Sequence, residues 1–72
     1  MTNDQVLDIL SESTGAERGG LLADAPFADM RIDSLDFMLF IDDMEDVIGK
    51  KIPDGAAGDF KTPADVTAWC NA

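Results

Sequence analysis

The stretch from Asp33 to Ile48 constrains the fold most, because the start, the buried face and the end of a helix are all visible in it. Ser34 stands where the pattern begins, and we predict that its hydroxyl caps the helix. Asp33 and Asp36 add negative charge near the positive end of the helix dipole, and Gly49 is a typical helix end. Apolar side chains recur at three- and four-residue steps, as on one face of a helix: Phe37, Phe40, Ile41, Met44, Val47 and Ile48. We therefore predict an amphipathic helix from Ser34 to about Ile48.

Further apolar side chains lie beside or outside this buried stripe, namely Leu35, Met38 and Leu39. A helix that is acidic and apolar on its outer side is typical of a surface that a partner protein contacts. Single exposed apolar residues are also common on ordinary proteins. The spacing alone leaves both interpretations open.

Two more segments carry clear helix signals. The first runs from Thr2 to Thr14, with Thr2 or Asn3 as the cap and Gly15 as the end, and its apolar face consists of Val6, Leu7, Ile9 and Leu10. The other begins at Thr62, which we predict to cap the helix. Pro63 follows at the first helical position and Asp65 where a capping box places its acid. Three side chains of that helix should face inward: Val66, Trp69 and Cys70.

The segment from Gly15 to Ile32 is a long connection that glycines and Pro26 keep irregular, with a helical turn expected near Arg18–Leu22. It must be held down by its apolar residues, which are Leu21, Leu22, Phe27, Met30 and Ile32. After the Ser34 helix, Ile52 should anchor a shorter loop, and 56–60 should form a brief helical turn. No segment alternates with period two. We predict an all-α fold, a small four-helix bundle with three main helices and one short helix, as a single domain over residues 1–72 with a long loop between helices 1 and 2.

Charge and size exclude several classes of function. The chain has 72 residues, enough for one small domain that buries only about 60% of the surface of its unfolded chain. Its net charge is −10, from 15 acidic and 5 basic side chains, and no basic residue lies between Ile32 and Gly49. This charge argues against binding to nucleic acid and to anionic membranes. It favours a partner with a basic surface, reached by electrostatic steering that salt weakens.

Cysteine and histidine usage exclude further chemistry. Cys70 is the only cysteine and there is no histidine, so the chain has no internal disulfide, no zinc-type ligand set and no histidine base. No signal peptide and no apolar run of membrane-spanning length is visible. We expect a cytoplasmic monomer.

The run Asp33-Ser34-Leu35-Asp36, followed by the acidic helix to Ile48 and then by Ile52-Pro53-Asp54, resembles the acyl carrier protein family. That family includes the peptidyl and aminoacyl carrier domains of assembly-line enzymes. The upstream residues 27–30 and the segment from Thr62 to Trp69 also resemble the family, so the likeness covers nearly the whole chain.

The resemblance implies that Ser34 is the attachment point of 4′-phosphopantetheine, which a phosphopantetheinyl transferase donates from coenzyme A. Acyl or aminoacyl intermediates would travel as thioesters on this arm, between enzymes of fatty-acid, polyketide or nonribosomal peptide biosynthesis. The chain would then be a non-catalytic carrier with no catalytic residue of its own. A loading enzyme and a downstream synthase or transferase would dock through basic patches on a surface made of Asp33, Leu35, Asp36, Met38, Leu39, Asp42, Glu45 and Asp46.

The sequence also departs from the family pattern. Arg31 stands where glycine is usual, and the run from Phe27 to Asp33 is one residue short. Leu39 replaces a frequent glutamate, and Asp42 replaces a frequent apolar residue, so we expect specialised partners. Phe37 stands where a small residue is common, near the cavity that shelters acyl chains in the family, so we predict a short or polar cargo. The initial Met1 and the short C-terminal end favour a free-standing protein.

Two other functions compete with the carrier. An unmodified acidic interaction module could use the same surface of residues 34–48. A calcium-binding protein is suggested by Asp33, Asp36, Asp42 and Asp43, but their spacing lacks the alternating ligands and central glycine of an EF-hand loop. An enzyme has the least support, because no nucleophile with an adjacent base and no phosphate-cradling glycine loop can be identified.

Overall fold

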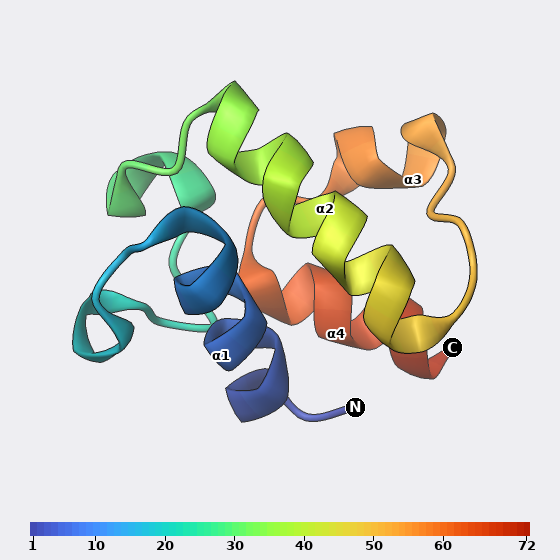
Figure 1. Ribbon diagram of the computed structural model, residues 1–72, viewed down its shortest axis with the longest axis horizontal. Helices are drawn as coiled ribbons and strands as arrows, with labels where there is room; N and C mark the ends of the chain where they lie inside the picture. Colours follow the sequence, from blue (N-terminus) through green and yellow to red (C-terminus); the bar gives the residue numbers. More distant parts are fainter.

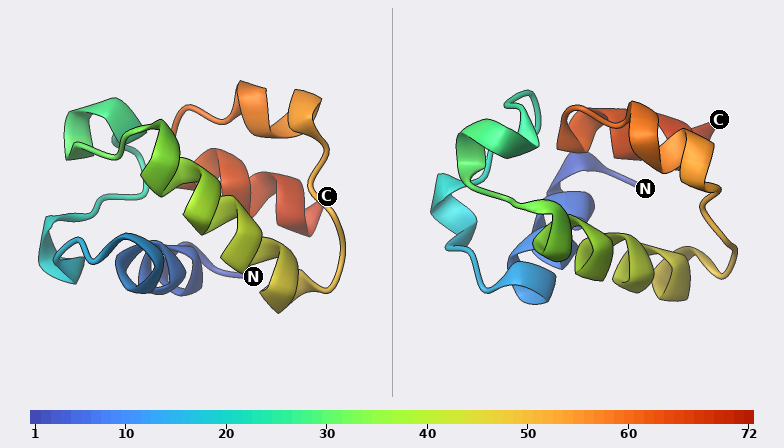
Figure 2. Two further views of the ribbon diagram at one scale, coloured as in Figure 1. Left: turned by 45° about the horizontal axis from the view of Figure 1, so that its top comes forward. Right: turned by 90° about the horizontal axis from the view of Figure 1, so that it is seen from above.

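The computed structural model describes all 72 residues and contains helices but no strand. Its elements in order are α1 (Asn3–Thr14), two 3₁₀ turns (Arg18–Gly20 and Phe27–Met30), α2 (Ser34–Ile48), α3 (Asp54–Asp59) and α4 (Pro63–Asn71). α1 packs against both α2 and α4, and α2 runs diagonally across the molecule (Figure 1). Seen from above, α3 and α4 lie on one side of α2, so its opposite side faces outward (Figure 2). The predicted small all-α bundle is confirmed. None of these helices is both long and apolar enough to span a bilayer.

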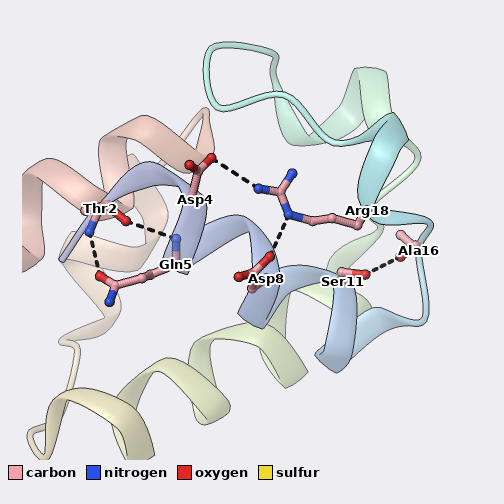
Figure 3. A network of polar contacts seen from close by, with 7 residues as sticks. All are labelled: Thr2, Asp4, Gln5, Asp8, Ser11, Ala16 and Arg18. Atoms are coloured by element: carbon pink, nitrogen blue, oxygen red, sulfur yellow. Dashed lines mark hydrogen bonds and ion pairs between the residues drawn. The ribbon is translucent and has the colours of Figure 1, made fainter.

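The ends of α1 and α4 follow the local sequence signals. The Thr2 hydroxyl accepts a hydrogen bond from the Gln5 N–H, and the Gln5 side chain accepts one from the Thr2 N–H, which closes a capping box (Figure 3). Gly15 ends α1 in the left-handed conformation. Thr62 and Asp65 form the same box at α4. Hydrogen bonds from the Lys61 and Thr62 N–H groups lower the pKa of the Asp65 carboxyl, because they stabilise its charged form.

The start of α2 differs from the prediction in one respect. The cap is Asp33, whose Oδ1 accepts the Asp36 N–H at 2.8 Å, and not Ser34. A cap residue precedes the first helical residue, and here Ser34 already has helical geometry. The Ser34 hydroxyl therefore does not cap the N-terminus of α2. The predicted span of α2 and its end at Gly49 are confirmed.

The core is a single apolar cluster of Val6, Leu7, Leu10, Leu21, Phe27, Ile32, Phe40, Ile41, Met44, Ile52 and Val66. Phe27 contacts Phe37 in an edge-to-face arrangement with ring centroids 5.1 Å apart, and Phe40 lies 5.9 Å from Phe27. Ile52 is the buried loop anchor, as predicted. Two expectations were wrong: Val47 and Leu22 are more than half exposed, because neither packs against the core cluster.

The long connection is held by polar contacts as well as by its apolar residues. Arg18 bridges two carboxylates of α1, with Nε 2.8 Å from Asp8 and Nη2 3.2 Å from Asp4 (Figure 3). This pairing raises the pKa of the Arg18 guanidinium. The Phe27 N–H donates to the Lys61 carbonyl at 3.0 Å, which joins the connection to the segment before α4. Of the two 3₁₀ turns in this connection, the one at Arg18 was predicted and the one at Phe27–Met30 was not.

The short helix α3 begins two residues earlier than expected.

Arg31 is the one non-glycine residue with a positive φ, 61°. It directly follows the Phe27–Met30 turn. A left-handed backbone costs an ordinary residue about 1–2 kcal/mol, whereas glycine adopts it freely and loses about 0.5–1 kcal/mol through its more flexible unfolded chain. We expect Arg31→Gly to raise the free energy of unfolding by about 0.5–1 kcal/mol.

Urea unfolding monitored by circular dichroism measures this change in the free energy of unfolding. Arg31→Ala is the matched control. Alanine removes the same charge but keeps the Cβ atom that strains the left-handed backbone. An equal gain in both variants would show that charge, and not backbone strain, is responsible.

Candidate functional site

Ser34 is exposed at the start of α2, and its hydroxyl differs from every other side-chain hydroxyl of the chain. The chain has three serines, four threonines and no tyrosine. All the other hydroxyls make hydrogen bonds within the chain, those of Thr2, Ser11, Ser13, Thr14, Thr62 and Thr67. Only the Ser34 Oγ has no such partner, so it is free to react with an external group.

The backbone around Ser34 suits a negatively charged substituent. The Asp36 N–H is satisfied by the Asp33 side chain and the Phe37 N–H by the Asp33 carbonyl. The N–H groups of Ser34 and Leu35 have no partner within the chain. Unpaired N–H groups and the positive end of the helix dipole favour a phosphate at this point. The residues present therefore fit a phosphodiester on the Ser34 oxygen.

An apolar groove of about 710 Å³ lies beside Ser34. Its walls come from the start of α2, from the Phe27–Met30 turn and from the end of α3 with the residues after it, and its main apolar side chains are Phe27, Ile32, Phe37, Met38, Ala57 and Phe60. The polar residues that line it are Asp33, Ser34 and Lys61. A neighbouring hollow of about 170 Å³ shares three lining residues with this groove, namely Phe37, Met38 and Ala57.

Most of the predicted partner-binding residues lie on the outward side of α2. Leu35, Met38 and Leu39 are 66%, 64% and 45% exposed, and Asp42 and Asp46 are exposed farther along the helix. Steps of four, three and four residues align Leu35, Leu39, Asp42 and Asp46 along one strip of the helix. The strip is thus apolar near Ser34 and acidic toward the end of α2.

Two of the predicted surface residues have a different setting. Asp36 is half-buried. The Glu45 side chain is only 16% exposed, and its Oε2 accepts the Ile52 N–H at 2.6 Å. Glu45 therefore binds the loop that follows α2, a contact between residues seven apart that the helical pattern did not indicate. The nearby ion pair with Lys51, at 3.8 Å, adds little because the lysine is almost fully exposed.

Glu45→Ala should lower the free energy of unfolding by about 1–2 kcal/mol, because a part-buried backbone N–H loses a charged acceptor. Asp46→Ala, one residue further and exposed, should change it by less than about 0.5 kcal/mol. Chemical denaturation of both variants checks the contrast. A Glu45 variant as stable as the Asp46 variant would mean that the Ile52 contact contributes nothing.

The remaining reactive groups show no second site. No group of three or more histidine, cysteine, aspartate or glutamate side chains is arranged to hold a metal ion. Burial raises the pKa of the Cys70 thiol, which reduces its thiolate fraction at neutral pH.

Over residues 4–70 the sequence matches the family described as "Phosphopantetheine attachment site". The match spans nearly the whole chain, so the protein belongs to this family, whose prosthetic group is 4′-phosphopantetheine. Members are carrier proteins and are generally non-catalytic. No individual curated protein matches the sequence.

Proposed function

We propose that Ser34 is the residue to which 4′-phosphopantetheine is attached, and that the protein carries acyl or aminoacyl intermediates between biosynthetic enzymes. The observation that carries this proposal is the Ser34 hydroxyl, the only one with no hydrogen bond within the chain, in a protein of the phosphopantetheine family. The arm, when bound, supplies a thiol that holds the cargo as a thioester.

The residues around Ser34 would assist its modification by a phosphopantetheinyl transferase. In that reaction the Ser34 oxygen bonds to phosphorus and loses its proton, while coenzyme A releases adenosine 3′,5′-bisphosphate. The unpaired N–H groups of Ser34 and Leu35 favour the phosphate charge. Asp33 stays engaged with the Asp36 N–H, which keeps the first turn of α2 in place.

The outward strip of α2 supports docking of the transferase, of a loading enzyme and of a downstream synthase or transferase. Its acidic part complements basic patches, and its apolar part, Leu35 and Leu39, offers contact area next to the proposed attachment point, together with the neighbouring exposed Met38. The same strip also supports a second candidate function, an unmodified interaction module, because docking through α2 does not require the arm.

Intact mass after incubation with coenzyme A, magnesium and a broad-specificity phosphopantetheinyl transferase separates these two functions. A carrier gains the mass of one phosphopantetheine. A chain that gains no mass with several transferases, while it still binds a partner through α2, would be the interaction module.

We further propose that the cargo is short or polar. Three core residues, Phe40, Met44 and Leu10, have no exposed surface. The ring of Phe37 packs against Phe27, and Phe37 lines both the groove and the neighbouring hollow. A long alkyl chain would have to displace these side chains to enter the core.

An octanoyl-loaded form tests the cargo proposal by methyl NMR. We expect the Met44 and Ile41 methyl signals to stay near their positions in the unloaded carrier, because the chain remains outside Phe37. Phe37→Ala is the matched variant and should let the chain in, so that both signals move. Strong shifts of Met44 in the unsubstituted protein would overturn the proposal.

A further inference from the structure

Four of the five basic side chains lie outside the groove beside Ser34, and three of them are already engaged. Arg18 pairs with Asp4 and Asp8. Lys51 lies 3.8 Å from Glu45, and Lys50 lies 4.9 Å from the centre of the Trp69 ring. Neither Arg31 nor Lys61 makes a salt bridge or a side-chain hydrogen bond, and of these two only Lys61 lines the groove. In a protein of net charge −10, Lys61 is thus the only basic residue that lines this groove, and its side chain forms no salt bridge.

The position of Lys61 is defined by its backbone. Its N–H donates to Asp65 Oδ2 at 2.9 Å, and its carbonyl accepts the Phe27 N–H at 3.0 Å. These bonds fix the Lys61 Cα atom beside the groove wall formed by Phe27 and the end of α3. The flexible side chain can then place its ammonium group over the apolar floor.

We propose that this groove takes a short acyl group that ends in a carboxylate, with the Lys61 ammonium as its counter-ion. The inference rests on the proposed carrier function, because the acyl group would reach the groove from an arm on Ser34. The apolar walls suit the methylene groups of such a cargo, and the volume of about 710 Å³ falls within the usual range of small-molecule pockets.

The other charged groups at this site set the orientation of the cargo. Asp33 lines the groove on the Ser34 side and would repel a second anion there. Its carboxylate is occupied by the Asp36 N–H at the helix N-terminus. Asp65, which accepts the Lys61 N–H, lies on the α4 side and attracts the Lys61 charge without forming a salt bridge with it. The free carboxylate of the cargo therefore belongs on the Lys61 wall, away from Asp33.

The test compares two loaded forms of the full chain, one with glutaryl and one with valeryl, which differ only in a terminal carboxylate or methyl group. Both are made enzymatically from the matching coenzyme A esters. The readouts are the melting temperature and the amide NMR signals of Gly58, Phe60 and Lys61, measured at about 0.02 M and about 0.5 M salt. Lys61→Gln removes the cation, and Lys51→Gln is the control that removes an exposed lysine elsewhere.

We expect the glutaryl form to melt about 1–5 °C above the valeryl form at low salt. Its Lys61 amide signal should also move relative to the valeryl form. Both differences should disappear in Lys61→Gln and at high salt but persist in Lys51→Gln. Loaded forms that behave alike, or a difference that survives in Lys61→Gln, would overturn this inference and leave the carrier function intact. Failure to load any coenzyme A ester would overturn both.

Discussion

Ser34→Ala will take up no phosphopantetheine from coenzyme A, whereas the unsubstituted chain will gain one group per molecule. The variant removes the only side-chain hydroxyl that is free of intramolecular hydrogen bonds. Because Asp33 and not Ser34 caps α2, the helix start keeps its hydrogen bond to the Asp36 N–H. We therefore expect complete loss of modification with little change in stability, within about 0.5 kcal/mol.

Intact mass spectrometry measures the modification, and circular dichroism confirms that the variant is folded. Ser13→Ala is the matched control, since the Ser13 hydroxyl donates to the Ile9 carbonyl and to Asp43 across the α1–α2 contact. This control should be modified fully although it loses a contact between helices. A mass gain in Ser34→Ala, or none in Ser13→Ala, would contradict the assignment of Ser34.

Phe40→Ala will have the largest effect on stability, a loss of about 3–5 kcal/mol in the free energy of unfolding. Phe40 has no exposed surface and lies within 6.3 Å of both Phe27 and Phe37, measured between ring centroids. A cavity at this point would open between α2 and the Phe27–Met30 turn. Because a domain of this size has about 4–11 kcal/mol of stability, the variant should be largely unfolded in low denaturant.

Guanidinium unfolding followed by helical circular dichroism measures this loss, and Leu39→Ala is the neighbouring control. Leu39 is 45% exposed on the outward strip, so its truncation should cost less than about 1 kcal/mol. Phe40→Leu, which refills part of the cavity, should fall between the two. Equal midpoints for the Phe40 and Leu39 alanine variants would contradict the described core.

Local signals in the sequence determined the helices and the position of Ser34. Threonine caps, Pro63 and the glycines at helix ends act within one or two turns, so the bounds of α1, α2 and α4 could be predicted from neighbouring residues. The three-to-four-residue spacing likewise separated the buried side of α2 from Leu35, Met38 and Leu39. The motif around Ser34 also suggested it as the attachment residue that we propose.

The tertiary structure decided which side chains those helices bring together. Glu45 was predicted to be a surface residue. In the fold, the Ile52 N–H donates a hydrogen bond to its carboxylate. Val47 has the spacing of a core residue, yet nothing packs over the last turn of α2 at that point. Lys61 lies far from Ser34 in sequence and lines the same groove only because the segment before α4 is bonded to Phe27. Helix starts and ends depend on bonds between near neighbours, whereas burial and the groove depend on contacts between distant segments, which local periodicity does not encode.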